Sequence, residues 1–245
     1  MGRQWMQKKR ETNAAKKGKV ATKLVRDIAI AAKSGADPAM NARLAVVLEA
    51  ARKQSVSSDT IQRAIKRGIG EEEGVIYESV NYEGYAPNGV AVYVQCLTDN
   101  RNRTGSEVKN IFTKNGGSFA EPGAVAWQFD RKGQVFIAKE AIGEDDLTLL
   151  AADAGAEDIH DFGDEWQVLT PATELHVVRT AIEEAGIPVK SGDLTMIPSS
   201  TINLDQEAAA KQVLRLVDAL EDHDDVEAVY ANFDIPESVL EAVSQ

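Results

Sequence analysis

The chain has 245 residues, 43% of them hydrophobic, and a formal net charge of −12. This length exceeds that of a usual single domain, so we expect two or three compact units, each able to bury a core. No run approaches the roughly 18 consecutive apolar residues of a membrane helix, and the first residues lack the apolar stretch of a signal peptide. We therefore expect a cytoplasmic protein without a membrane segment.

The charge is divided unevenly along the chain. Residues 1–70 carry 16 lysines and arginines against 5 acids, a net of +11, which leaves 11 against 34, a net of −23, for the remainder. A basic block beside an acidic one indicates that one part of the molecule attracts the phosphates of a polyanion while the rest repels them. The alternative is two solvated surfaces without a partner.

A single cysteine, Cys96, lies in the apolar run VAVYVQCL. It excludes a disulfide within the chain and a cysteine-based zinc site. We interpret Cys96 as a small buried hydrophobe in a strand, not as a nucleophile.

Apolar spacing predicts three short amphipathic helices in the basic part. The first spans residues 21–34 and precedes Gly35. Asn41 is expected to cap the second, and Ser58 with Asp59 opens the third, which stops at Gly68. The run GEEEG at 70–74 reads as a linker.

Beyond the linker the pattern becomes mixed. Strands are expected at 80–85, 90–97 and 124–130, with a helix at 104–115 closed by Gly116 and Gly117. The next stretch reads as strand 134–138, helix 144–154, strands 158–161 and 165–169, helix 171–185 and strand 194–198. That order, β-α-β-β-α-β, is the ferredoxin-like split unit.

The segment before this unit lacks a second helix–strand pair. Helix 205–221 and strand 226–233 supply one at the end of the chain, so we expect a discontinuous α/β domain with the ferredoxin-like unit inserted in it. The predicted fold class is α+β: an N-terminal three-helix bundle plus two α/β ferredoxin-like domains, one inserted in the other. The predicted domains are 1–75, then 76–131 with 202–245, and the insert 132–201.

Residues that could carry catalysis are sparse. His160, His176 and His223 have no metal-ligand spacing and read as surface residues, and the common nucleotide-binding loops are absent. The carboxylates at 144–146 suit the start of a helix, where the dipole favours negative charge. We expect no enzyme activity, no cofactor and no small-molecule substrate.

The N-terminal region carries the candidate binding residues. Several cations lead into the first helix, where Lys19, Lys23 and Arg26 share a face at helical spacing. Lys66 and Arg67 end the third helix, where the dipole alone also favours cations. Trp5 is suited either to stacking on a base or to anchoring the arm. The predicted nucleic-acid-binding residues here are Arg3, Lys8, Lys9, Arg10, Lys16, Lys17, Lys19, Lys23, Arg26, Lys66 and Arg67.

Another candidate is the segment TDNRNRT at 98–104. Thr104 and Glu107 have capping-box spacing, which places Arg101 and Arg103 just ahead of a helix N-terminus, where the dipole disfavours cations. Two explanations fit cations in this unfavourable position. They bind a phosphate or a carboxylate, or they pair with Asp99 or with an acid at a domain interface. We add Arg101 and Arg103 to the predicted binding residues.

These motifs identify a resemblance. The chain resembles the YebC/PmpR family of transcriptional regulators, which also includes the mitochondrial translational activator of cytochrome c oxidase subunit I. The similarity runs through AIKRG (64–68), YEGYAPNGVAV (82–92), TDNRNRT (98–104), FTKNGG (112–117) and FDIP (233–236). The N-terminal start departs from the family's GHSKW-type pattern, keeping glycine, tryptophan and basic charge but not the histidine and serine.

The resemblance implies a helical bundle with two α/β domains, one inserted in the other. It also implies DNA binding by some members and ribosome-associated work by others. The expected partner is therefore nucleic acid, with DNA-directed transcriptional regulation as the first hypothesis. A translation factor that binds rRNA on the ribosome and a non-catalytic protein-interaction adaptor remain as alternatives, because DNA and rRNA both offer phosphate.

Overall fold

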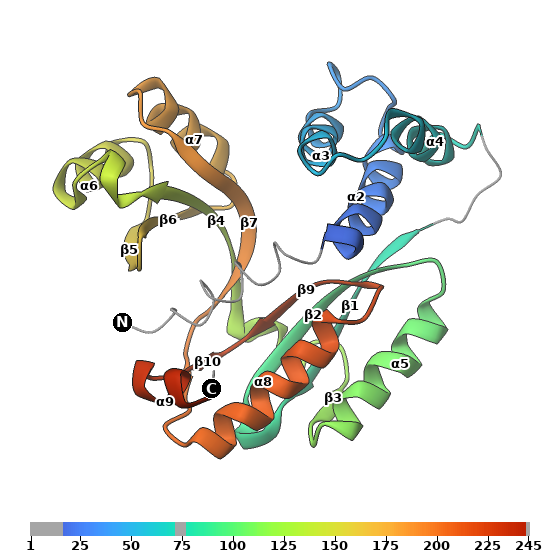
Figure 1. The fold of residues 1–245 in the computed structure, drawn as a ribbon, viewed down its shortest axis with the longest axis vertical. Helices are drawn as coiled ribbons and strands as arrows, with labels where there is room; N and C mark the ends of the chain where they lie inside the picture. The colour runs from blue at the N-terminus through green and yellow to red at the C-terminus, as the bar shows by residue number, and fades with distance from the viewer. Residues whose placement is uncertain (1–16, 72–76, 244–245) are drawn as a thin grey trace. The chain divides into compact units, whose positions relative to one another are not determined.

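The computed structural model describes residues 17–71 and 77–243. These residues form two compact units, one of residues 17–71, 77–124 and 211–229, the other of 125–210 and 230–243. Figure 1 traces the helices and strands of both. The mixed α+β class, with an N-terminal helical region followed by α/β domains, is confirmed.

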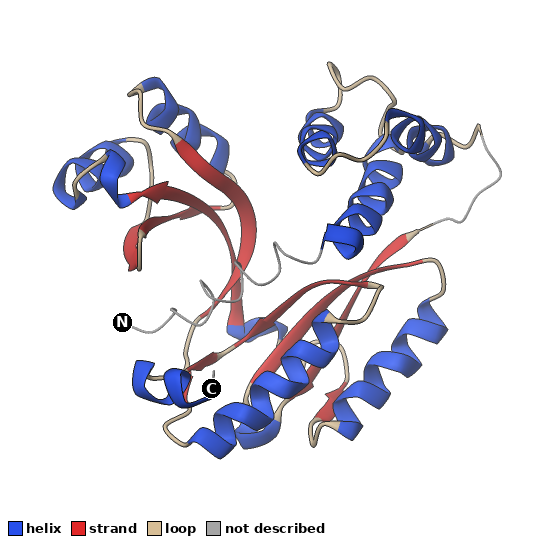
Figure 2. Ribbon diagram, viewed as in Figure 1, coloured by secondary structure: helices blue, strands red, loops and turns tan. Residues whose placement is uncertain are grey.

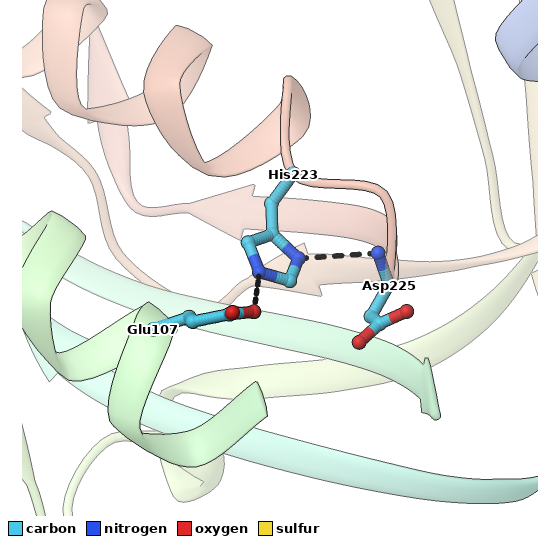
Figure 3. A group of neighbouring side chains, drawn as sticks. All are labelled: Glu107, His223 and Asp225. Atoms are coloured by element: carbon cyan, nitrogen blue, oxygen red, sulfur yellow. Dashed lines mark hydrogen bonds and ion pairs between the residues drawn. The ribbon is translucent and has the colours of Figure 1, made fainter. Parts of the chain in front are cut away.

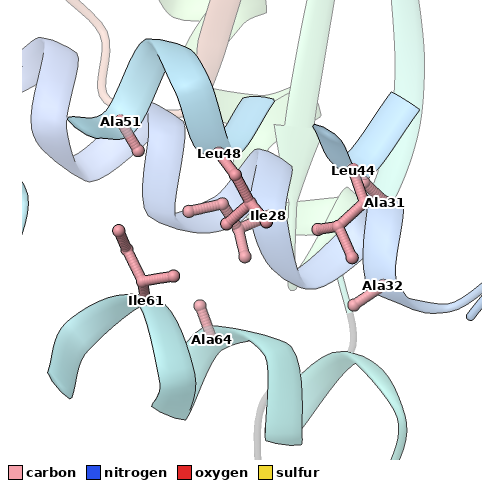
Figure 4. Close-up of a cluster of buried hydrophobic side chains, with 8 residues drawn as sticks. All are labelled: Ile28, Ala31, Ala32, Leu44, Leu48, Ala51, Ile61 and Ala64. Carbon is pink, nitrogen blue, oxygen red and sulfur yellow. The ribbon is translucent and has the colours of Figure 1, made fainter. Parts of the chain in front are cut away.

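The first unit begins with a bundle of three helices, α2 (Lys17–Ala32), α3 (Ala42–Lys53) and α4 (Ser58–Gly68). Asn41 caps α3, its side chain accepting from the Leu44 amide at 3.1 Å, as predicted. Ser57, one residue before the predicted opening, caps α4. Side chains from all three helices meet in one apolar core (Figure 4), whose buried members are Ile28, Ala31, Ala32, Leu44, Leu48, Ala51, Ile61 and Ala64.

Gly68 sets how closely α4 approaches α2. A Cβ at this position would lie 2.2 Å from the Ala29 carbonyl oxygen and 2.6 Å from the Ala32 Cβ. Both distances are far below van der Waals contact, so no larger residue fits without separating the helices. This gives a physical reason for glycine at the end of the AIKRG motif.

The same unit contains most of a four-stranded sheet in the order β3-β1-β2-β9. Its elements are β1 (Glu78–Tyr85), β2 (Ala91–Thr98), α5 (Arg101–Lys114), β3 (Ser118–Ala120), α8 (Glu207–Glu221) and β9 (Val226–Ala231). The ring of Phe112 on α5 packs where a Cβ at Gly84 of β1 would lie. The strand β9 completes this sheet, although the other three strands lie more than a hundred residues earlier in the chain. The lack of a second helix–strand pair in the first segment predicted this.

The loop after α5 has the geometry that its two glycines favour. Gly116 adopts a φ of +75°, and the Gly117 amide donates to the Phe112 carbonyl at 2.9 Å. The Gly116 amide donates to the Thr113 carbonyl, which completes a Schellman motif. The predicted end of this helix is confirmed.

The second unit holds a four-stranded antiparallel sheet in the order β5-β6-β4-β7. Its elements are β4 (Phe129–Ala138), α6 (Glu144–Asp153), β5 (Asp158–Phe162), β6 (Glu165–Pro171), α7 (Leu175–Glu184) and β7 (Val189–Pro198). The helices pack on one face through a core that includes Val135, Leu147, Trp166, Val168 and Ile182. The predicted β-α-β-β-α-β unit is confirmed, and Figure 2 shows its two helices beside the strands.

Both sheets have the same spatial order. Numbered along the chain, β4, β5, β6 and β7 lie in the order second, third, first, fourth. The other sheet, β3-β1-β2-β9, has the same order if its strands are numbered from β2 instead of β1. In that numbering β2 is first, β3 second, β1 third and β9 fourth. The sheet β3-β1-β2-β9 of the first unit thus has the ferredoxin-like strand order, with the third strand of that order, β1, coming first in sequence.

Several predicted boundaries are wrong. Residues 126–128 form a short 3-10 helix instead of a strand, and β4 runs unbroken from Phe129 to Ala138 because it pairs with β7 along nearly its whole length. The polar segment RKGQ at 131–134 lacks the apolar alternation of a strand, so the sequence predicted two separate strands there. Helix α7 starts at Leu175, since Pro171 still belongs to β6, and β7 begins at Val189, five residues earlier than predicted.

Several short elements were not predicted from the sequence: η1 (Pro87–Gly89), β3, η3 (Lys139–Ala141), β8 (Ile202–Asn203), β10 (Phe233–Asp234) and α9 (Glu237–Val243). β8 and β10 pair in parallel. Among the residues described, no helix has the length and apolar character needed to cross a bilayer.

Candidate nucleic-acid interface

Much of the predicted basic arm lies outside the described residues. This applies to Arg3, Lys8, Lys9, Arg10 and Lys16, and to Trp5. Lys17 and Lys19 lie in the first turn of α2.

Arg26 on α2 turns toward the loop between α8 and β9. Its Nη1 donates to the Asp224 carbonyl at 2.7 Å and lies 3.2 Å from the Asp225 carboxylate. The guanidinium also lies 5.6 Å from the centre of the Tyr77 ring. Only 17% of the Arg26 side chain is exposed, so this member of the predicted basic face is already engaged within the protein.

The end of α4 presents a second group of cations. Lys66 is exposed and Arg67 is half-buried, in the last turn, where the helix dipole favours them. The bundle exposes further cations that the sequence reading left out: Arg43, Arg52, Lys53 and Arg63. Lys53 and Arg63 pair with acids one turn earlier on their helices, at 2.8 Å in both cases, so part of their positive charge is offset.

The helix at TDNRNRT does not begin where the capping box predicted. Asn100 is the N-cap, its side chain accepting from the Arg103 amide at 3.1 Å, and α5 starts at Arg101. Thr104 cannot serve as the cap because its hydroxyl is used elsewhere: it lies 2.7 Å from Asp225 and 2.7 Å from the Thr98 hydroxyl. The two arginines therefore occupy the first turn of α5 instead of preceding it.

Arg101 and Arg103 have different surroundings. The Arg101 side chain is exposed and has no acidic partner among the described residues, while its backbone carbonyl accepts from the Tyr82 hydroxyl at 2.9 Å. Arg103 lies 2.9 Å from Asp99 and 2.6 Å from Asp225. Its hydrogen bond to Asp225 raises the pKa of the Arg103 guanidinium. Of the two explanations, pairing with an acid holds for Arg103.

Asp225 is the centre of this arrangement, and the sequence reading missed it. Its side chain is 4% exposed and accepts hydrogen bonds from Thr104 and Arg103, with Arg26 on its other oxygen and the Thr98 hydroxyl at 3.4 Å. Desolvation raises the pKa of Asp225, but the bonds from Thr104 and Arg103 outweigh it and hold the pKa below its ordinary value. The carboxylate is thus a stable anion.

His223 stands beside Asp225 and is not the surface histidine that we predicted. Its Nδ1 accepts from the Asp225 amide at 3.1 Å, and its Nε2 lies 2.8 Å from the Glu107 carboxylate (Figure 3). Because Nδ1 must carry a lone pair to accept from an amide, the neutral ring is protonated on Nε2 and donates to Glu107. The ring therefore fixes the turn between α8 and β9 against α5.

Glu107, His223 and Asp225 are close enough together to share a metal ion. Their ligand atoms are already occupied, however: both ring nitrogens are hydrogen-bonded, and Asp225 accepts from Thr104 and Arg103. Binding an ion would require breaking these bonds. The arrangement fits a structural junction better than a metal centre.

Cys96 is 1% exposed within β2, and burial raises the pKa of its thiol to about 12. The thiolate, which is the reactive form, is therefore scarce at neutral pH. This fits the interpretation of Cys96 as a small core residue.

Family models cover nearly the whole chain. Residues 2–71 match the N-terminal domain of the TACO1/YebC protein, and residues 77–233 match the TACO1/YebC second and third domains. A probable transcriptional regulatory protein of Thermobifida fusca is 50% identical over 232 residues, which cover 94% of this chain and 93% of the relative. Another, from a Parafrankia species, is 52% identical over 233 residues, covering 94% and 92%.

A solved structure gives the same result for the fold. The crystal structure of the conserved hypothetical protein Aq1575 from Aquifex aeolicus matches with a TM-score of 0.82 and 42% identity, covering 91% of this chain and 92% of that protein. Fold, sequence motifs and full-length similarity agree, and the chain belongs to the TACO1/YebC family.

Proposed function

We propose that this chain is a regulatory protein that binds nucleic acid and that it acts on transcription by binding DNA through its basic N-terminal region. The observation that carries the proposal is the charge division, +11 in residues 1–70 against −23 in the rest. Exposed cations gain little stability from one another, but they release counterions when they meet a polyanion. The acidic remainder would be repelled, which orients the protein on its target.

The proposed contact residues are the basic arm, the outer face of the helical bundle and the start of α5. They are Arg3, Lys8, Lys9, Arg10, Lys16, Lys17, Lys19, Lys23, Arg26, Lys66, Arg67, Arg101 and Arg103. Lys66 and Arg101 are exposed and suited to meet phosphate as they stand. Arg26 and Arg103 are paired with Asp225 and must first be freed.

The names of the relatives support a regulatory role, since both relatives described above are named probable transcriptional regulatory proteins. We propose in addition that the protein acts without catalysis, in the cytoplasm, and with the domain boundaries 1–75, 76–131 with 202–245, and 132–201. The acidic α/β domains would present the basic region to its target.

Two measurements on the full chain test the proposal. Mobility shifts with a DNA duplex should show binding, and sedimentation through a sucrose gradient should leave the protein near the top whether or not ribosomes are added. Co-migration with ribosomes, together with weak binding to DNA, would contradict the DNA-directed role and would favour a role in translation.

A further inference from the structure

Two elements of the first unit are joined by one arginine. Arg26 reaches from α2 to the turn between α8 and β9, where it contacts the Asp224 carbonyl at 2.7 Å and the Asp225 carboxylate at 3.2 Å. The same carboxylate holds Arg103 of α5 at 2.6 Å. One buried carboxylate therefore pairs with two cations from segments far apart in sequence.

A second contact lies next to the first. Asp27, the neighbour of Arg26, faces Glu227 of β9, and burial together with the Asp27 carboxyl raises the pKa of Glu227. Two facing carboxyl groups avoid charge repulsion when one of them holds a proton. The polar contacts of α2 with the turn and with β9 thus include an ion pair and two facing carboxyl groups.

The chemistry of Arg26 and Arg103 makes them suitable for exchange. A guanidinium group binds carboxylate and phosphate through the same fork of donors. Asp225 therefore takes the place on these arginines that a phosphate would take. We propose that Asp225 competes with nucleic-acid phosphate for Arg26 and Arg103, so that binding is coupled to release of α2 from the turn between α8 and β9.

The remaining partners of Asp225 make this release feasible. Removing one member of a buried ion pair is costly when it strands the other charge. Here Asp225 keeps the Thr104 hydroxyl at 2.7 Å and the Thr98 hydroxyl at 3.4 Å after both arginines leave. The carboxylate keeps these hydroxyl donors, and the bond from Thr104 still joins it to α5.

This inference rests on the proposed function, and its test separates the two. Asp225→Asn removes the competing charge, while Asp224→Asn removes the same charge from the exposed neighbour and leaves its carbonyl in place. By fluorescence anisotropy with a labelled DNA duplex and a labelled RNA duplex, D225N should bind at least about five-fold more tightly than wild type, and D224N within about two-fold. When Arg26 is also replaced by glutamine, the increase in duplex affinity caused by D225N should be smaller than in the wild-type background.

Equal effects of D225N and D224N would overturn the competition. A wild-type protein that binds neither duplex would instead refute the proposed function, and the competition with it. If D225N does not fold, hydrogen exchange on the wild-type protein decides the question. Peptides covering residues 222–227 should exchange faster when the bound duplex is saturating, and unchanged or slower exchange would overturn the proposal.

Discussion

The Arg103 guanidinium donates to the Asp225 carboxylate at 2.6 Å, between residues 122 positions apart in the chain. This bond ties the start of α5 to the turn between α8 and β9. Arg101, two residues earlier, has no comparable partner among the described residues. The two arginines of the same motif therefore differ in the free protein, since Arg103 is paired with acids and Arg101 is exposed.

Single substitutions should separate these roles. Arg103→Gln should destabilise the protein by about 1 to 2 kcal/mol, less than for a fully buried pair because 43% of the Arg103 side chain is exposed. Arg101→Gln should change the free energy of unfolding by less than about 0.5 kcal/mol. Urea denaturation of both variants measures the difference, and equal losses would contradict the division of roles.

Gly68 provides a test of the bundle. Gly68→Ala places a Cβ 2.2 Å from the Ala29 carbonyl oxygen, so we expect a loss of roughly 1 to 3 kcal/mol from overpacking. Gly143→Ala is a suitable control, since a Cβ there meets nothing within 4 Å. It should cost at most about 1 kcal/mol, because Gly143 occupies the N-cap of α6. Thermal unfolding that ranks the variants the other way would refute the packing account.

The carboxyl pair between α2 and β9 predicts a dependence on pH. Desolvation and the facing Asp27 carboxyl raise the pKa of Glu227 from 4.5 to about 8 in the folded protein. The folded state therefore holds a proton that the unfolded state has lost, so stability is full below pH about 4.5 and falls as the pH rises toward 8. Glu227 is exposed on β9, so solvent screening reduces the effect.

Glu227→Gln should remove this part of the pH dependence, since an amide donates to Asp27 without a shared proton. Melting temperatures at pH 5 and pH 8 should lie closer together in this variant than in wild type. Glu184→Gln, at the exposed end of α7, serves as the control and should keep the wild-type difference. A wild-type protein that becomes more stable between these pH values would contradict the assignment.

Local patterns predicted much of the fold. Alternating and helical apolar spacing located the three helices of the bundle and the β-α-β-β-α-β unit, since those signals lie within short windows. The missing helix–strand pair pointed correctly to α8 and β9. The position of β4 was misjudged because its register is fixed by pairing with β7, sixty or so residues later, and its own polar stretch gave no sign of a strand.

The candidate site was predicted only in part. Asn100 and Thr104 both had the chemistry of an N-cap, and the choice between them depends on Asp225, which engages the Thr104 hydroxyl. Asp225 itself lies in the acidic run EDHDD, where nothing local distinguishes it from its neighbours. Its role comes from tertiary contacts with Arg26 and Arg103, and a single sequence does not reveal them.

The most direct test of nucleic-acid binding by the basic region is the salt dependence of affinity for a DNA duplex. If about six cations meet phosphates, log affinity should fall against log salt with a slope of about −5. Replacing Lys16, Lys17 and Lys19 by glutamine should flatten this slope by up to about three units. Replacing Lys132, Lys139 and Lys190 in the other unit, which pair there with Glu157, Asp161 and Glu165, removes the same charge and should leave the slope unchanged. A flat wild-type dependence, or equal changes in the two triple variants, would contradict the account.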